Sequence, residues 1–227
     1  MNIENIKKQF PIFNNKVQNN DLVYLDSANS SQKPQVVVDR IYDFYTKEFS
    51  NVGRSVHYLA VAATNLYEET RSLVQKYINA KDPNEIVFTK GATEAINLVA
   101  NTFGQKFLKE GDEIILTELE HHSNYVPWHY LRRSKGVQIK FAEINSDGEI
   151  SLESIQKLIS PKTKMIAITH LSNVTGAILP IKEITRLAHS KNIPILIDGC
   201  QGAPHLRIDM QEIGCDFYAI SCHKMYG

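Results

Sequence analysis

The sequence predicts an α/β fold with a mostly parallel sheet covered by helices on both faces. After about residue 80, short β-branched runs alternate with amphipathic segments of helical length. Such alternation is typical of strand–helix–strand crossovers. No internal repeat, low-complexity tract or Gly/Ser linker interrupts the pattern.

Two long helices are predicted before the alternation begins, at residues 33–49 and 58–79, because apolar residues recur in each at three- and four-residue steps. We therefore predict an N-terminal helical segment over residues 1–80 and a larger domain over residues 81–227. The strands expected in the larger domain are 85–89, 113–117, 137–142, 164–170, 193–198 and 215–221. The helices expected between them start at Thr93 and near Asn124, and cover 152–159 and 181–191.

Composition excludes several functional classes. The 227 residues are 43% hydrophobic and 22% charged, which suits an ordinary globular protein. The 25 Lys and Arg balance the 25 Asp and Glu, so bulk charge indicates neither a nucleic-acid partner nor an anionic membrane. The N-terminus has no signal-peptide core and no apolar run reaches the length of a membrane span. We expect a cytoplasmic location.

The three cysteines, Cys200, Cys215 and Cys222, contain no CxxC pair. They are expected to be reduced, partly buried residues. Cys222 and His223 match no common spacing of metal ligands, so no metal site is predicted.

Small and polar residues follow the predicted strands, where ligands bind in parallel sheets. Gly91 and Ala92 come before a helix that Thr93 is expected to cap, with Glu94 in its first turn. This arrangement suits either an anion site at the helix N-terminus or a routine capped helix.

Histidines follow the next strands in the same way. His121 and His122 come after residues 113–117, and we expect at most one of them to face a site. His170 and Asn173 follow residues 164–170. Histidines in loops are more often structural than catalytic, and asparagine is common in turns, so the position of each residue alone does not establish a functional role.

Asp198 ends an apolar strand, and a buried carboxylate needs a cationic or hydrogen-bonding partner. It serves either a ligand or the start of a short following helix, and Gln201 lies close behind it. The last strand leads to Ser221, His223 and Lys224. A phosphate cup, a buried carboxylate and a lysine together suit pyridoxal 5′-phosphate (PLP), which needs an amine, a phosphate cradle and an anion at its ring nitrogen.

At these residues the chain resembles the class V aminotransferase family of fold-type I PLP enzymes, and within it the Suf-type cysteine desulfurases. The motifs that carry the resemblance extend over nearly the whole chain. They are YLDSA (24–28), GATEAINLVAN (91–101), GDEII (111–115), EHHSNYVPW (120–128), ITHLSNVTG (168–176), ILIDGCQ (195–201) and CDFYAISCHKMYG (215–227).

The resemblance implies a role for each candidate residue. Lys224 would be the Schiff-base lysine, His121 would stack on the cofactor ring, and Asp198 would pair with the ring nitrogen. Gln201 would approach the ring hydroxyl, and Asn173 would lie near the cofactor and the substrate carboxylate. The residues expected at the phosphate are Ala92, Thr93, Ser221 and His223.

The resemblance also implies a reaction. The family takes sulfur from L-cysteine, leaves L-alanine, and passes the sulfur through an enzyme persulfide to an acceptor for iron–sulfur cluster assembly. Its members are homodimers, and some act as selenocysteine lyases. A kynureninase-like activity is the more distant alternative within the family.

Several positions depart from the family pattern. Gly53 stands where the family has histidine and Ser55 where it has glycine, although Arg54 and His57 are retained. The family's D-G-A-Q and S-G-H-K motifs carry Cys200 and Cys222 here. Cys222 therefore adds a side chain two residues before Lys224, where the family has a glycine whose backbone can adopt conformations that other residues rarely do.

Family members continue well beyond the lysine, through the last strands of the sheet and a small C-terminal domain that carries the catalytic cysteine and a substrate-binding arginine. We therefore expect this chain by itself to release neither alanine nor sulfide from cysteine. It is either half of a desulfurase completed by a second polypeptide or a non-catalytic remnant.

Overall fold

The computed structural model describes residues 2–227, which group into two compact units. The first unit contains the residues up to Tyr77 together with 82–86 and 222–227, and the second contains 78–81 and 87–221. The predicted division at residues 80 and 81 differs from this grouping mainly at the chain's last six residues. We propose that the domains of the chain divide between residues 80 and 81.

The first unit is largely helical. Its helices are α1 (Ile3–Lys7), α2 (Gln35–Asp43) and α3 (Tyr58–Tyr77), and a short hairpin pairs β1 (Lys16–Val17) with β2 (Asn20–Asp21). A π-helical turn over Phe44–Glu48 extends α2, so both predicted N-terminal helices are present. Asn2 caps α1 by accepting hydrogen bonds from the backbone N–H groups of Glu4 and Asn5.

The strand predicted at residues 85–89 is wrong. Pro83–Glu85 form a 3₁₀ turn, begun by Asp82 accepting a hydrogen bond from the Asn84 N–H, and residues 86–89 belong to no strand. The guanidinium of Arg71 donates to the carbonyl oxygen of Ile86. A β-branched run favours an extended backbone, but it forms a strand only where a neighbouring strand takes its hydrogen bonds.

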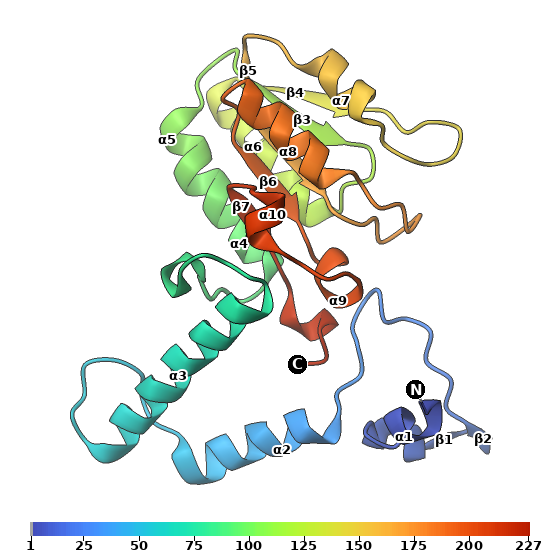
Figure 1. Ribbon diagram of the computed structural model, residues 1–227, viewed down its shortest axis with the longest axis vertical. Coiled ribbons are helices and arrows are strands. Elements are labelled where there is room, and N and C mark those ends of the chain that lie inside the picture. Colours follow the sequence, from blue (N-terminus) through green and yellow to red (C-terminus); the bar gives the residue numbers. More distant parts are fainter. Residues whose placement is uncertain (1) are drawn as a thin grey trace. The chain divides into compact units, whose positions relative to one another are not determined.

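The second unit contains a five-stranded parallel sheet in the order β4–β3–β5–β6–β7 (Figure 1). The five strands are β3 (Glu113–Thr117), β4 (Gln138–Ala142), β5 (Thr163–Thr169), β6 (Ile195–Asp198) and β7 (Phe217–Ala219). All five lie within one or two residues of predicted positions. The central strands are buried on both faces, which explains their unbroken apolar runs.

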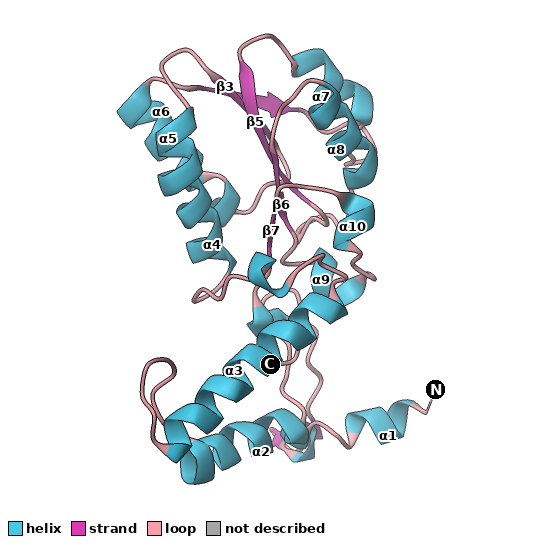
Figure 2. Ribbon diagram, turned by 60° about the vertical axis from the view of Figure 1, so that its left-hand side comes forward, coloured by secondary structure: helices cyan, strands magenta, loops and turns pink. Residues whose placement is uncertain are grey.

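Helices cover both faces of this sheet (Figure 2). One face carries α4 (Ala92–Val99), α5 (Gln105–Phe107) and α6 (Val126–Lys135), and the other carries α7 (Leu152–Leu158), α8 (Ile181–Ser190) and α10 (Met210–Ile213). A π-helical turn at Ala100–Gly104 joins α4 to α5, and α9 (Gly202–His205) follows β6. Trp128 of α6 is fully buried in the core of the first face, with Ile114, Leu116 and Met165.

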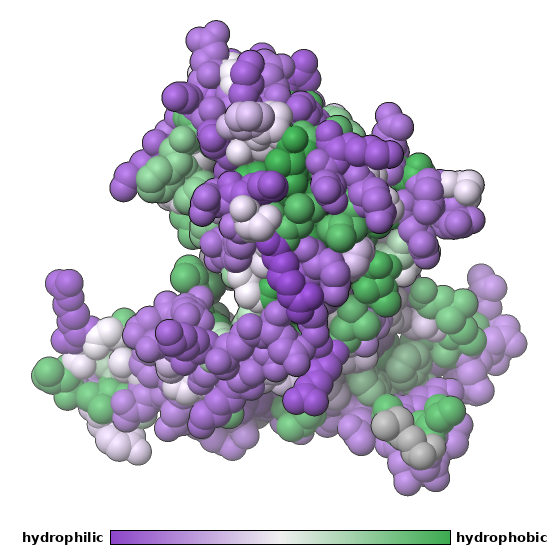
Figure 3. All heavy atoms as spheres, turned by 45° about the horizontal axis from the view of Figure 1, so that its top comes forward, coloured by the Kyte–Doolittle hydropathy of each residue, from purple (hydrophilic) through white to green (hydrophobic). Residues whose placement is uncertain are grey.

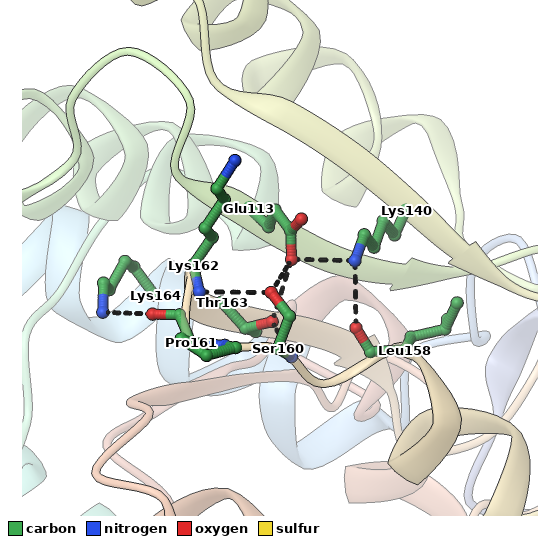
Figure 4. Close-up of polar contacts among 8 residues, drawn as sticks. All are labelled: Glu113, Lys140, Leu158, Ser160, Pro161, Lys162, Thr163 and Lys164. Carbon is green, nitrogen blue, oxygen red and sulfur yellow. Dashed lines mark hydrogen bonds and ion pairs between the residues drawn. The ribbon is translucent and has the colours of Figure 1, made fainter.

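A polar cluster joins the amino ends of β3 and β5 to the middle of β4 (Figure 4). The Glu113 carboxylate lies 2.8 Å from the Lys140 ammonium and accepts a hydrogen bond from the Ser160 hydroxyl at 2.5 Å. Lys140 also donates to the carbonyl oxygen of Leu158. Burial by itself would raise the pKa of Glu113, but the hydrogen bonds from Lys140 and Ser160 lower the net pKa below its ordinary value. The cluster ties β3 to β4 and to the start of β5.

Hydrophilic residues cover most of the face shown in Figure 3, with smaller apolar areas between them. None of the helices formed by residues 2–227 combines the length and hydropathy needed to cross a bilayer.

Candidate functional site

The carboxyl ends of β3, β5, β6 and β7 lie along one edge of the sheet, because the strands are parallel neighbours. Thr169, at the end of β5, is in register with Asp198, at the end of β6, and Asp198 is in register with Ala219 of β7. The loops that leave this edge therefore start close together. They carry most of the candidate residues of the second unit.

Asp198 is the most buried of the polar candidates, with 3% of its surface exposed. One carboxylate oxygen accepts a hydrogen bond from the Cys200 N–H at 3.0 Å, and its backbone oxygen accepts one from the His170 N–H at 2.9 Å. Helix α9 starts later, at Gly202, so Asp198 is not its N-cap. Gln201, at the N-cap position, is also buried.

The Asp198 loop packs closely on a histidine–tyrosine pair. A Cβ at Gly199 would lie 2.0 Å from a ring carbon of Tyr218, and one at Gly202 would lie 2.4 Å from His170 Nδ1. The same Nδ1 is 2.8 Å from the Tyr218 hydroxyl. Burial lowers the pKa of His170 to about 4 and raises that of Tyr218, so both rings are neutral at pH 7. The two glycines let the loop approach these rings.

The N-terminus of α4 meets the segment that follows β7. The Ala92 N–H donates to the Ser221 hydroxyl at 2.9 Å, and Cys200 Sγ lies 3.6 Å from the same oxygen. Gly91 is the N-cap residue, with a φ of +148° that favours glycine. The prediction that Thr93 caps this helix is therefore wrong, because the helix begins one residue earlier; Thr93 is exposed in its first turn. Glu94 lies in the first turn as predicted.

His121 lies in the turn after β3 and is exposed. Its Nδ1 accepts a hydrogen bond from the Ser123 N–H at 3.2 Å and lies 2.6 Å from the Ser123 hydroxyl. Because Nδ1 is an acceptor, the neutral ring carries its proton on Nε2. Asn173 is exposed in a turn between Leu171 and Ile178, which form an isolated antiparallel bridge.

The sequence interpretation missed Glu120, whose carboxyl group lies in the interior although part of the residue reaches the surface. It accepts hydrogen bonds from Thr117, Asn124 and Thr169. Burial raises its pKa to about 8 against the effect of these bonds, and the nearby Asp198 raises it further. The one available signal was its position, three residues beyond the end of β3.

Lys224 and His223 belong to the first unit, in a 3₁₀ turn over Cys222–Lys224. The carbonyl oxygen of His223 accepts hydrogen bonds from the Ser31 N–H at 3.1 Å and from the Lys33 ammonium at 2.7 Å. Partial burial, with the positive charges of Lys224 and Lys33, lowers the pKa of His223. Since the other candidates lie in the second unit, their grouping with Lys224 into one cofactor site is a proposal.

Cys222 does not strain the backbone beside Lys224. The non-glycine residues with positive φ in the described chain are five, and Cys222 is not among them. Its side chain is exposed. The glycine that the family has at this position is therefore not required here for a left-handed conformation.

Comparisons with known proteins agree over nearly the full chain. The sequence model of the class V aminotransferase family matches residues 23–227. A probable cysteine desulfurase of Halalkalibacterium halodurans is 48% identical over 100% of this chain and 56% of its own length. A cysteine desulfurase of Serratia proteamaculans is 45% identical over 99% of this chain and 55% of its own length. The chain thus spans about half the length of these curated relatives.

Solved structures show the same fold. A cysteine desulfurase from Escherichia coli superposes with a TM-score of 0.88 at 37% identity, covering 100% of this chain and 56% of that one. An apo cysteine desulfurase from Thermococcus onnurineus superposes with a TM-score of 0.90 at 35% identity, covering 98% of this chain and 53% of that one.

Proposed function

Because this chain belongs to the class V aminotransferase family, we propose that it provides the cofactor-binding part of a PLP-dependent cysteine desulfurase that acts on L-cysteine. The observation that carries the proposal is Asp198, a carboxylate buried at the end of β6 at the edge where ligands of such sheets bind. Relatives that cover the whole chain are named cysteine desulfurases.

The residues at this edge fit PLP in their chemistry. Asp198 supplies the anion that keeps the ring nitrogen protonated, and burial strengthens that interaction. The N-terminus of α4, where Ala92 and Thr93 lie, supplies the Thr93 N–H and the positive end of a helix dipole for the phosphate, whereas the Ala92 N–H donates to Ser221. Ser221 accepts a hydrogen bond from the Ala92 N–H, and its hydroxyl proton remains for the phosphate, which supports its proposed role as a phosphate ligand.

The remaining roles follow the family assignment. Lys224 contributes the amine that holds the cofactor, and His223 joins the phosphate ligands. Gln201 contacts the ring hydroxyl, His121 covers the ring face, and Asn173 binds near the substrate carboxylate. When bound, PLP supplies an electron-poor ring that withdraws electrons from the bonds around the substrate's α-carbon.

The proposal extends to the reaction and its partners. L-cysteine is converted to L-alanine, and the sulfur passes to an enzyme cysteine as a persulfide and then to an acceptor protein for iron–sulfur cluster assembly. A homodimer is the proposed assembly. These statements rest on the family, since the chain spans about half of its relatives' length.

Covalent trapping tests the central assignment. We expect that borohydride reduction of the protein with PLP attaches the cofactor to Lys224, as located by peptide mass spectrometry. Lys224→Ala should lose the label, whereas Lys182→Ala, which removes an exposed lysine paired with Glu212, should retain it. A label distributed over surface lysines, with Lys224 unmodified, would refute the proposal.

The reaction has its own test. Any alanine and sulfide that the protein forms from L-cysteine, with PLP and a thiol reductant, should appear in equal amounts and should be lost in Lys224→Ala. Equal yields from the two proteins would show that the chemistry does not use Lys224.

A further inference from the structure

We propose that Glu120 is a positioning residue that holds the turn carrying His121 against the carboxyl ends of β3 and β5. The importance of that turn rests on the proposed function, in which His121 covers the cofactor ring. The geometry of Glu120 itself is independent of that function. Its carboxylate contacts three separate segments through hydrogen bonds whose directions are fixed.

Trp128 determines which atom of the Asn124 side chain faces Glu120. An indole N–H can only donate, and Trp128 Nε1 donates to Asn124 Oδ1 at 3.0 Å. The amide of Asn124 is thereby oriented, with its Nδ2 toward Glu120, and it donates to Oε2 of that residue at 2.6 Å. Asn124 and Trp128 both have 0% exposure, so water does not compete for these groups.

The other carboxylate oxygen faces the sheet. Oε1 of Glu120 accepts a hydrogen bond from the Thr169 N–H at 2.9 Å and from the Thr117 hydroxyl at 2.6 Å. A backbone N–H also can only donate. Each oxygen therefore faces at least one obligatory donor, a requirement that a carboxylate meets and an amide of the same shape does not.

The consequence for His121 follows from the turn itself. The Asn124 N–H donates to the His121 carbonyl oxygen at 2.8 Å, which closes the turn. Glu120 is joined to His121 by the peptide bond, and its side chain binds Asn124 at the other end of the turn. The carboxylate thus fixes both ends of the segment that carries the imidazole.

Burial and the charges around Glu120 affect the pKa of its carboxyl group, which can be measured. In the described part of the chain, Glu120 forms no ion pair. Asp198 on β6 is the charged group that acts on it; His121 and His122 follow it in the same turn, and His170 follows Thr169. When protonated, the carboxyl group can donate only to the Thr117 hydroxyl, because its other partners are donors. Loss or gain of the Glu120 proton therefore changes the strength of the hydrogen bond from Asn124 to Glu120. It thereby also changes the hydrogen bond from Trp128 to Asn124.

Trp128 is the only tryptophan of the chain, so its emission reports on this network in PLP-free protein. We expect wild-type emission to change with pH with a midpoint near 8. Glu120→Gln should abolish the change. Glu118→Gln, which alters an exposed carboxylate two residues earlier, should preserve it. Emission that is flat in the wild type, or that titrates identically in Glu120→Gln, would overturn the proposal.

Amide exchange tests the positioning role. The side-chain amide of Asn124 should exchange at least about tenfold faster in Glu120→Gln, because a glutamine side chain has one oxygen and cannot accept from both Asn124 and Thr169. It should be unchanged in Glu118→Gln. Trp128→Phe removes the indole N–H that orients the side-chain amide of Asn124. The amide can then turn over and form a hydrogen bond with Gln at position 120, so the double variant Glu120→Gln with Trp128→Phe should recover slow exchange. Equal exchange in Glu120→Gln and wild type would refute the role.

Cofactor binding separates this inference from the proposed function. PLP affinity should fall about tenfold in Glu120→Gln and stay within twofold in Glu118→Gln. A wild-type protein that fails to bind PLP would contradict the proposed function, while the emission and exchange results would still decide the role of Glu120.

Discussion

Substituting Gly199 by alanine tests the packing of the Asp198 loop most directly. The new Cβ would lie 2.0 Å from Tyr218 Cε1 and 2.2 Å from Cζ. Non-bonded carbons approach only to about 3.5 Å. The ring or the loop must therefore move by roughly 1.5 Å, more than the small adjustments that a packed interior allows.

The cost can be worked from these contacts. Inserting a methyl group into a packed site costs about 1–3 kcal/mol. Displacing Tyr218 also removes its 2.8 Å hydrogen bond to His170, which adds about 1 kcal/mol. We expect Gly199→Ala to destabilise the second unit by about 2–4 kcal/mol.

A double-mutant cycle with Tyr218 provides the assay. Urea unfolding followed by Trp128 emission gives the free energy of unfolding of the second unit for each variant. In a Tyr218→Ala background the ring is gone, so Gly199→Ala should cost less, with a coupling energy of roughly 1–3 kcal/mol. In the matched Tyr218→Phe background the ring remains, and Gly199→Ala should stay costly. Additive costs in the alanine background would refute the clash.

Two further substitutions probe the ends of the strands. Ser221→Ala leaves the buried Ala92 N–H without its acceptor, so we expect thermal unfolding to show a loss of about 1–3 kcal/mol, and an unchanged stability would show that another group takes that N–H. Glu113→Gln removes the charge that Lys140 and Ser160 bind, and should cost about 1–2 kcal/mol at pH 7. Since the folded pKa of Glu113 is lowered, this contribution is fully present above its ordinary value of 4.5 and disappears as the pH falls through the folded value; wild type and Glu113→Gln should therefore converge in stability in acid, and a constant difference down to pH 2 would contradict the assignment.

The sheet was predictable because its strands are buried. Continuous apolar runs located β3 at its observed bounds and placed β6 within two residues. The strand predicted at residues 85–89 is absent, and most of this segment is exposed. Val87 and Phe88 remain 66% and 40% exposed, and a run of suitable residues does not reveal whether a neighbouring strand exists.

The candidate site was predictable only where residue type and strand position coincide. Asp198 stood out because a carboxylate ended an apolar run, and burial followed from that position. Glu120 gave no such signal. Its importance comes from Thr169, which is 49 residues away in sequence, and from an amide oriented by Trp128. Contacts of this kind depend on the folded arrangement and leave no local pattern.

The polar cluster around Glu113 affects which sequence changes the protein can tolerate during evolution. It joins β3 and β5 at their amino ends and β3 to the middle of β4, whereas Asp198, Glu120 and Ser221 lie at or beyond the carboxyl ends of their strands. Replacements in the loops at the carboxyl ends leave that fastening intact. Sequence changes in these loops therefore need not loosen the sheet, which is the arrangement expected of a fold that hosts many different sites.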